Sequence, residues 1–70
     1  MTKFKIHSAY ITLGQFLKAK GYIGSGGEAK FFLSENTVLL NGERRHERGK
    51  KLYPNDTVVV NKDRYVIDTD

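Results

Sequence analysis

The sequence predicts an α+β fold in which two short helices pack against a small antiparallel sheet. Two segments in the first half have apolar residues three and four positions apart, and each begins with a helix-capping pattern. From residue 37 onward, apolar and polar residues alternate as they do in strands, and an Asn-Gly pair provides a tight hairpin turn. The chain has 70 residues and no linker-like stretch, so residues 1–70 are expected to form one domain.

A short strand and a helix are expected first. Residues 3–7 alternate between polar and apolar, which predicts a half-buried strand. Thr12 and Gln15 have the spacing of a capping box, in which each side chain bonds the backbone amide of the other residue. Gly21 is expected to end this helix in the left-handed conformation. The helix face that should be buried consists of Leu13, Phe16 and Leu17.

A second helix is expected between Ser25 and Asn36. Ser25 and Glu28 repeat the capping-box spacing, and Asn36 is expected to end the helix in the left-handed conformation. Phe31 lies on the side opposite the apolar stripe. We expect it to pack beneath the N-terminal strand or the last hairpin, with stacking on a nucleic-acid base as the alternative. The stripe that should face the core consists of Ala29, Phe32 and Leu33.

The second half is expected to form the sheet. Its turns are marked by Asn, Gly, Pro and Asp, which favour tight turns, and its strands by alternating apolar residues. In chain order we expect a strand at 37–40, a turn at Asn41-Gly42, a strand at 43–45, a polar loop at 46–51, a turn at 52–56, a strand at 57–60, a turn at 61–63 and a returning strand at 64–67.

The charge balance of the chain indicates a polyanionic partner. The sequence has 12 Lys and Arg residues against 8 Asp and Glu, a formal net charge of +4 and an isoelectric point near 9.5. It has no Cys, which excludes disulfides and thiolate metal sites and fits a reducing compartment. Its start lacks the apolar run of a signal peptide, and no stretch reaches the length of a membrane span. We therefore expect a cytoplasmic protein without membrane contact.

No catalytic residue is identified. Ser25 lies among glycines, but its surroundings match neither the nucleophile elbow of hydrolases nor the phosphate-binding loop of NTPases, so we interpret it as a helix cap. His7 and His46 are far apart in the sequence, and neither has neighbours at metal-ligand spacing. We expect neither catalysis nor a metal or other cofactor.

The main candidate site is a basic loop. Five cations occur within eight residues just after the Asn-Gly turn, with Glu43 and Glu47 as the nearby acids. An Arg side chain binds phosphate through two nitrogens at once, which favours nucleic acid as the partner over a loop that is merely solvated. Gly49 would allow the backbone to approach a phosphate closely. The five cations are Arg44, Arg45, Arg48, Lys50 and Lys51.

A second anion site is expected at the start of the second helix. The amides of Gly26 and Gly27 have no side chains in front of them and lie at the positive end of the helix dipole. In the alternative interpretation, these glycines only let the two helices cross closely. Lys18, Lys20 and Lys30 either extend the same basic face along the helices or form ordinary solvated surface.

Residues 11–60 resemble the RNA-binding domain that is named after small-subunit ribosomal protein S-four and is also called the αL motif. The shared pattern has leucines in the first helix, a Gly turn, a Ser-led second helix with an Ala, a strand ending in Asn-Gly, and an Asn-Asp pair before an apolar strand. Here these positions are Leu13, Leu17, Gly21, Ser25, Ala29, Val38 to Gly42, and Asn55-Asp56. The runs Ser-Gly-Gly-Glu-Ala-Lys and Arg-Gly-Lys-Lys-Leu are most similar to the stand-alone bacterial YaaA-type proteins.

The resemblance implies binding of structured RNA, with ribosomal RNA as the expected ligand, transfer RNA as the alternative, and a ribosomal subunit and its assembly as the setting. Many family members carry Arg after the capping Ser and Arg-Leu-Asp at the start of the first helix. This chain has Gly26 and Thr12-Leu13-Gly14 there, so the RNA contacts would shift to Lys30 and the basic loop. We expect a monomer. Docking of an acidic protein through the same basic face is the alternative function.

Overall fold

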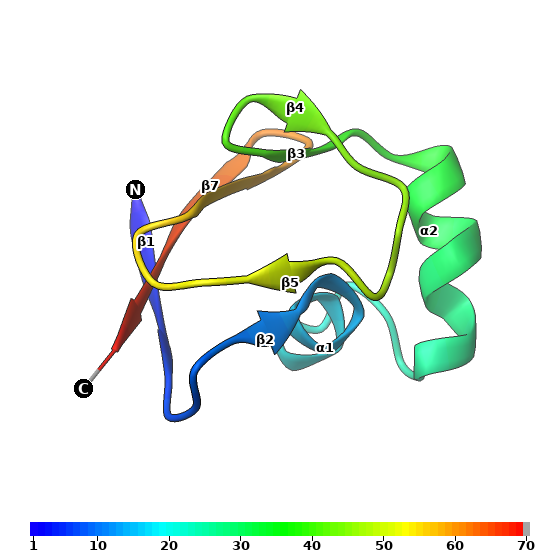
Figure 1. The fold of residues 1–70 in the computed structure, drawn as a ribbon. Helices are drawn as coiled ribbons and strands as arrows, with labels where there is room; N and C mark the ends of the chain where they lie inside the picture. Colours follow the sequence, from blue (N-terminus) through cyan, green and yellow to red (C-terminus); the bar gives the residue numbers. More distant parts are fainter. Residues whose placement is uncertain (70) are drawn as a thin grey trace.

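A computed structural model describes residues 1–69, in which a five-stranded sheet, two helices and a two-stranded ribbon surround one core (Figure 1). The helical elements are α1 (Leu13–Ala19), the single 3₁₀ turn η1 (Gly26–Glu28) and α2 (Ala29–Glu35). The strands are β1 (Thr2–Ile6), β2 (Ile11–Thr12), β3 (Val38–Leu40), β4 (Glu43–Arg44), β5 (Lys51–Leu52), β6 (Thr57–Val60) and β7 (Asp63–Thr69).

The larger sheet has the strand order β1-β7-β6-β3-β4, which confirms the α+β fold class. Neighbouring strands from β3 to β7 pair antiparallel, whereas β1 pairs parallel with β7, from Thr2 opposite Tyr65 to Ile6 opposite Thr69. The expected arrangement was antiparallel throughout, so β1 departs from it. The sequence marks β1 as a strand but carries no signal for its direction, because its partner lies at the other end of the chain.

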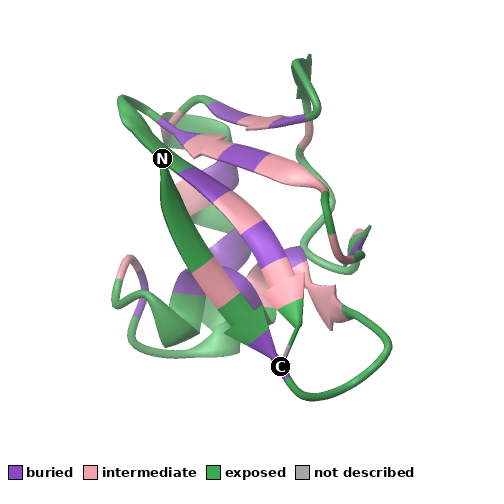
Figure 2. Cartoon of the chain, turned by 90° about the vertical axis from the view of Figure 1, so that its left-hand side faces the viewer, coloured by how far each residue is buried: buried purple, intermediate pink, exposed green. Residues whose placement is uncertain are grey.

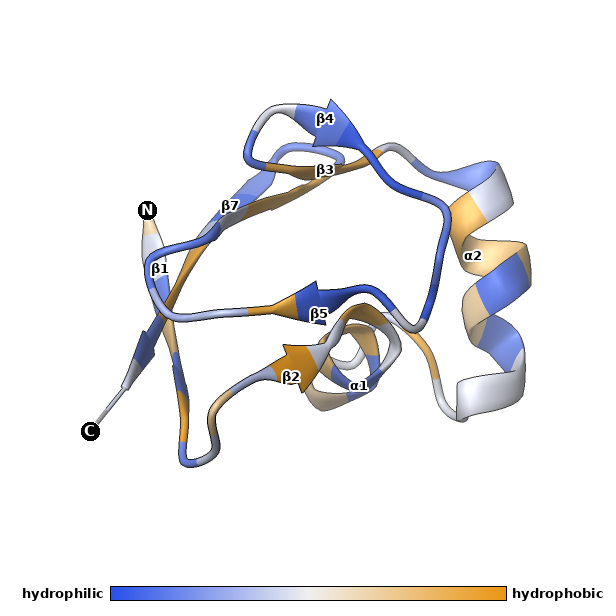
Figure 3. Ribbon diagram, viewed as in Figure 1, coloured by the Kyte–Doolittle hydropathy of each residue, from blue (hydrophilic) through white to orange (hydrophobic). Residues whose placement is uncertain are grey.

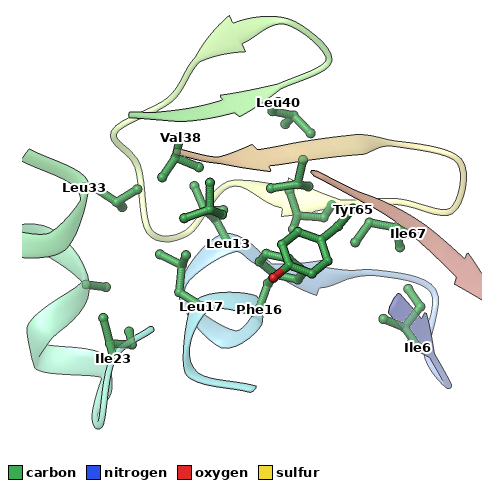
Figure 4. Close-up of a cluster of buried hydrophobic side chains, with 14 residues drawn as sticks. Ile6, Leu13, Phe16, Leu17, Ile23, Leu33, Val38, Leu40, Tyr65 and Ile67 are labelled. Atoms are coloured by element: carbon green, nitrogen blue, oxygen red, sulfur yellow. The ribbon is translucent and has the colours of Figure 1, made fainter. Parts of the chain in front are cut away.

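The core lies between one face of this sheet and the helices. Figure 2 shows the sheet in front and the helices behind it, with buried and less buried residues alternating along the strands. All three residues of the expected α1 face are buried, as predicted. The Phe16 ring makes an edge contact with Tyr65 at a centroid distance of 5.2 Å (Figure 4). It makes a second edge contact with Phe4 at 4.9 Å. These edge-to-face contacts add to the stabilisation that burial of the ring provides.

The expected capping of α1 is confirmed. The Thr12 hydroxyl accepts a bond from the Gln15 amide at 3.2 Å, and the Gln15 side chain accepts one from the Thr12 amide at 2.9 Å. Gly21 has a φ of +80°, the left-handed conformation that was expected past the helix end. The next amide, that of Tyr22, donates back to the Leu17 carbonyl at 2.9 Å, which satisfies a carbonyl of the last turn.

The expected capping of the second helix is wrong at both ends. The Glu28 amide donates to the Ser25 carbonyl at 3.1 Å, as in a 3₁₀ turn, so it is not available to the Ser25 hydroxyl. That hydroxyl instead donates to the Glu28 carboxylate at 3.3 Å. At the other end, Asn36 has an extended backbone, with a φ of −129°, and its side-chain amide donates to the Phe32 carbonyl at 3.0 Å.

The apolar stripe of α2 is narrower than expected. Ala29 and Leu33 are buried, whereas Phe32 is half-buried at the edge of the core, with its ring 5.7 Å from that of Tyr22. The expected packing of Phe31 beneath a strand or hairpin is wrong, because this side chain is 71% exposed. Residues two apart on a helix point about 200° apart, so burial of Ala29 turns Phe31 outward.

The turns of the sheet follow the predicted positions. Asn41 and Gly42 have φ values of 51° and 87°, as a tight hairpin turn between β3 and β4 requires. Asn61 also has a positive φ, of 56°, and lies in the turn that joins β6 to β7. The ribbon of β2 and β5 was not predicted, because each of its strands has two residues and they pair only through the tertiary fold.

Candidate nucleic-acid interface

The basic loop, defined here as residues 44–51, connects β4 to β5 and is bound to the start of α1. Figure 3 shows it as a nearly continuous hydrophilic segment that passes α2 and then runs along β2. The Leu13 amide donates to the Lys50 carbonyl and the Gly14 amide to the Arg48 carbonyl, each at 2.8 Å. The first amides of a helix have no partner within the helix itself. The loop backbone therefore satisfies the first turn of α1 and is held in place by it.

Gly14 is the point where the loop, α1 and α2 come closest. A Cβ atom at this position would lie 3.2 Å from the Arg48 carbonyl oxygen and 3.8 Å from the Ala29 Cβ. The first distance is tighter than side chains normally tolerate, so Gly14 allows the loop to approach the helix. Sequence reasoning assigned Gly14 no role. The available signal was a glycine in the first turn of a helix, where it weakens the helix and needs another reason to be present.

Arg48 joins the two parts of the expected site. Its guanidinium donates to the Gly26 carbonyl at 3.2 Å, which connects the basic loop to η1. Gly26 is exposed, and no atom lies within 4 Å of the position where its Cβ would be. The Glu28 carboxylate shares this turn and accepts a bond from the Gly24 amide at 3.2 Å. The amides at the start of η1 thus have an acidic neighbour as well as an Arg.

Arg45 differs from the other cations of the loop because it is paired with acids. Its guanidinium lies 3.2 Å from the Glu43 carboxylate and 3.8 Å from the Glu47 carboxylate, and the side chain is 30% exposed. The His46 amide bonds the Glu47 carboxylate at 3.0 Å and is the main cause of the lowered pKa of Glu47, to which Arg45 and Lys50 also contribute. Arg45 therefore orders the loop and has little uncompensated charge for a ligand.

Lys51 lies beside a pair of tyrosines. Its ammonium is 4.8 Å from the centroid of the Tyr10 ring, and the Tyr10 and Tyr53 rings are 5.9 Å apart. Lys50, Lys51 and Tyr53 help to line a hollow of about 270 Å³ on this side of the loop. No sequence pattern pointed to the two tyrosines, because the pairing of β2 with β5 brings them together.

The remaining two cations lie at opposite ends of α2. Lys30 is exposed in the first turn of α2, four residues after Gly26, whose carbonyl Arg48 bonds in η1. Arg44 pairs with Leu39 in the sheet, and its guanidinium is 3.5 Å from the Asn36 carbonyl, past the end of α2. The structure thus connects Arg48, Lys50 and Lys51 with the start of α1 and Arg48 with Gly26, and it places Arg44 apart from them. These residues, together with the exposed Gly27 and Lys30 that follow Gly26 in the chain, are called the basic face below: Gly26, Gly27, Lys30, Arg48, Lys50 and Lys51.

Comparison with known proteins identifies the family. The profile of the S4 domain family matches residues 4–68, which include both helices and nearly all of the sheet. The chain belongs to the S4 domain family. It is also 54% identical over 55 residues to a protein of Bacillus subtilis (strain 168) named "Probable ribosome maturation protein RlbA", covering 79% of this chain and 78% of the relative. The resemblance seen in the sequence is thereby confirmed.

Residues 1–69 show neither a metal-binding cluster nor a membrane-spanning helix. No cluster of three or more His, Asp or Glu side chains in this part of the chain has a geometry that would hold a metal ion. None of the helices described is long and apolar enough to cross a membrane.

Proposed function

We propose that this protein binds structured RNA without catalysing a reaction, that its ligand is ribosomal RNA, and that it serves ribosome maturation in the cytoplasm. The observation that carries the proposal is the attachment of the basic loop to α1 and η1, through the Leu13 and Gly14 amides and the Arg48 guanidinium. Membership of the S4 domain family and the name of the Bacillus relative support it.

The ordered loop is well suited to an RNA backbone. A loop that is already bonded to a helix loses little conformational freedom on binding, so less of the interaction energy is spent on ordering it. Arg48, Lys50 and Lys51 follow one another closely along the loop and can contact successive phosphates. Double-stranded RNA is recognised mainly through its shape, its phosphates and its 2′-hydroxyls, which a rigid basic surface can match.

Salt dependence of binding tests the proposal. Lys30 and Lys51 are exposed, and neither anchors the loop through a side-chain bond to its backbone. We expect a Lys30→Ala, Lys51→Ala double variant to bind ribosomal RNA fragments with a log–log salt slope shallower by about 1.4–1.8, from about 0.7–0.9 per lost phosphate contact. Its melting temperature should stay close to that of the parent, because exposed cations contribute little to folding.

The matched control removes the same charge from the far side of the molecule. Lys3 and Lys5 are exposed on β1, which lies on the side opposite α2 and the loop (Figure 1). A Lys3→Ala, Lys5→Ala variant should keep the parent's slope on RNA. If both double variants change the salt slope equally, RNA is attracted by the net charge of the protein, and the basic face is not the binding site. If the parent binds an acidic peptide such as polyglutamate in preference to RNA, the function is docking of an acidic protein. Transfer RNA in the same assay separates the two RNA classes.

A further inference from the structure

We infer that Phe31 is a stacking platform for one unpaired RNA base, so that the preferred ligand is a helix with an adjacent loop or bulged nucleotide. This inference rests on the proposed binding of RNA and specifies which kind of RNA is bound. Phe31 is 71% exposed, more than Tyr10 at 39% or Tyr53 at 48%. The Phe31 ring is therefore open to a ligand, and a base can stack on it without displacing a core contact.

Small residues leave the Phe31 ring accessible from one side. Ser34 lies next to Phe31 on the surface of α2, one turn after it, and Gly27 lies four residues before Phe31 in the η1 turn that leads into α2. Gly27 has no side chain, and only the Ser25 hydroxyl, at 3.9 Å, lies within 4 Å of where its Cβ would be. The Ser34 hydroxyl is turned back to the Phe31 carbonyl at 2.8 Å. A flat base can therefore approach the ring over these two positions.

The charges around Phe31 indicate from which side the RNA arrives. Lys30 lies beyond Gly27 and Ser34, on the flank of α2 that faces Gly26 and Arg48. Glu35 lies on the opposite flank, toward Phe32. The Glu28 carboxylate is held in the η1 turn by the Gly24 amide and the Ser25 hydroxyl, at 3.2 and 3.3 Å. Phosphates are attracted to the first flank and repelled by the second. A nucleotide whose backbone crosses Lys30 and Arg48 would thus present its base to the accessible side of the Phe31 ring.

The surroundings of Phe31 favour a base over a protein partner. Residues Lys30, Ser34 and Glu35 are exposed and polar, so Phe31 is a single aromatic side chain and not part of a broad apolar patch. Protein interfaces bury a contiguous core of apolar side chains. Stacking on a base requires only one ring, and any base offers a flat face for it.

A tryptophan at this position provides a direct readout, because the chain has no Trp of its own. The probes are a ribosomal RNA hairpin with an unpaired loop and a blunt RNA duplex of equal length. In a Phe31→Trp variant, we expect the hairpin to quench the indole fluorescence strongly and the duplex to do so weakly. Affinity for the hairpin should fall about 5- to 150-fold in Phe31→Leu, the range that loss of one base stack implies, and recover in Phe31→Tyr. The salt slope should not change, since no charge is removed.

The outcomes separate this inference from the proposed function. If the parent binds neither RNA with a salt-dependent affinity, the proposed function fails. If the parent binds RNA but Phe31→Leu binds the hairpin as tightly as the parent does, the stacking inference is wrong and RNA binding stands. Equal quenching by hairpin and duplex would also overturn it. Since Phe31 is exposed, these variants should melt as the parent does, and a melting curve verifies that each is folded.

Discussion

Replacing Gly14 with a larger residue should dislodge the basic loop from α1. In Gly14→Val the new Cβ would lie 3.2 Å from the Arg48 carbonyl oxygen and 3.4 Å from the Arg48 Cβ, and the γ-methyl groups would extend further into this contact. Overpacking of this kind costs about 1–3 kcal/mol. Valine regains up to about 0.5 kcal/mol of helix propensity relative to glycine. The net loss should be about 0.5–2.5 kcal/mol, and each kcal/mol lowers the melting temperature of so small a domain by about 4–8 °C.

Hydrogen exchange can show which hydrogen bonds are lost in Gly14→Val, in addition to the loss of overall stability. Amide hydrogen exchange should show faster exchange at residues 13 and 14, whose amides donate to the loop carbonyls at 2.8 Å in the parent. RNA affinity should fall further than the decrease in the folded fraction alone would cause, because Arg48 moves with the loop. Gly49→Val is the matched control, since no atom lies within 4 Å of its Cβ position and its φ is outside the left-handed region. That variant should melt within a few degrees of the parent.

A single result would refute this account of the loop. If Gly14→Val melts like the parent and residues 13 and 14 remain protected, then the loop is not packed against α1 as described. A fall in the stability of Gly49→Val equal to that of Gly14→Val would point the same way, because the penalty would then come from valine itself and not from the contact with Arg48.

Substitutions at four other positions test the core, a buried phenol and a turn. Phe16→Ala should lower the free energy of unfolding in urea by about 3–5 kcal/mol, because Phe16 is 0% exposed. Phe32→Ala should lower it by less than about half of that amount, because Phe32 is only half-buried. Burial, followed by hydrogen bonds to Tyr65 and Asp63, raises the pKa of Tyr22 above its ordinary value, so the folded state favours the neutral phenol. The free energy of unfolding of the parent should therefore fall as the pH rises above about 10, the ordinary Tyr pKa. Over the same pH range, the difference in unfolding free energy between the parent and Tyr22→Phe, measured in urea titrations, should become smaller. Asn41 has a φ of 51° and accepts a bond from the Thr57 amide at 2.9 Å, so Asn41→Ala should lower the melting temperature more than Asn41→Gly, which avoids the left-handed strain of about 1–2 kcal/mol.

The prediction that failed at the second helix shows the limit of local patterns. Ser25 and Glu28 have the same spacing as Thr12 and Gln15, yet only the second pair forms a capping box. Two glycines follow Ser25, and the chain there adopts a 3₁₀ turn in which the Glu28 amide is already bonded. A spacing rule cannot distinguish these cases, because it records which groups are present and not which bond the backbone forms first.

The candidate site was predicted in composition but not in arrangement. The sequence identified the cations of the basic loop, the glycines of η1 and Lys30 as a group. It did not show that Arg45 is neutralised by Glu43 and Glu47, or that Arg44 lies apart at the end of α2. It also predicted that Phe31 packs beneath a strand or hairpin, whereas the side chain is exposed. Each of these depends on side-chain directions that are fixed when the loop and helix pack, and formal charge along the chain carries no such information.

The sequence by itself determined the features that depend on residues a few positions apart. These are the capped first helix, its glycine stop, the Asn-Gly hairpin turn and the alternation that turns one face of the sheet toward the core. The tertiary structure alone decided the parallel pairing of β1 with β7, the ribbon of β2 and β5, and the contact of Arg48 with Gly26. Local features follow from backbone preferences and from hydrogen bonds within one turn, which each segment carries with it. The others join segments distant in the chain, and they form only because burial of the common core fixes where those segments lie.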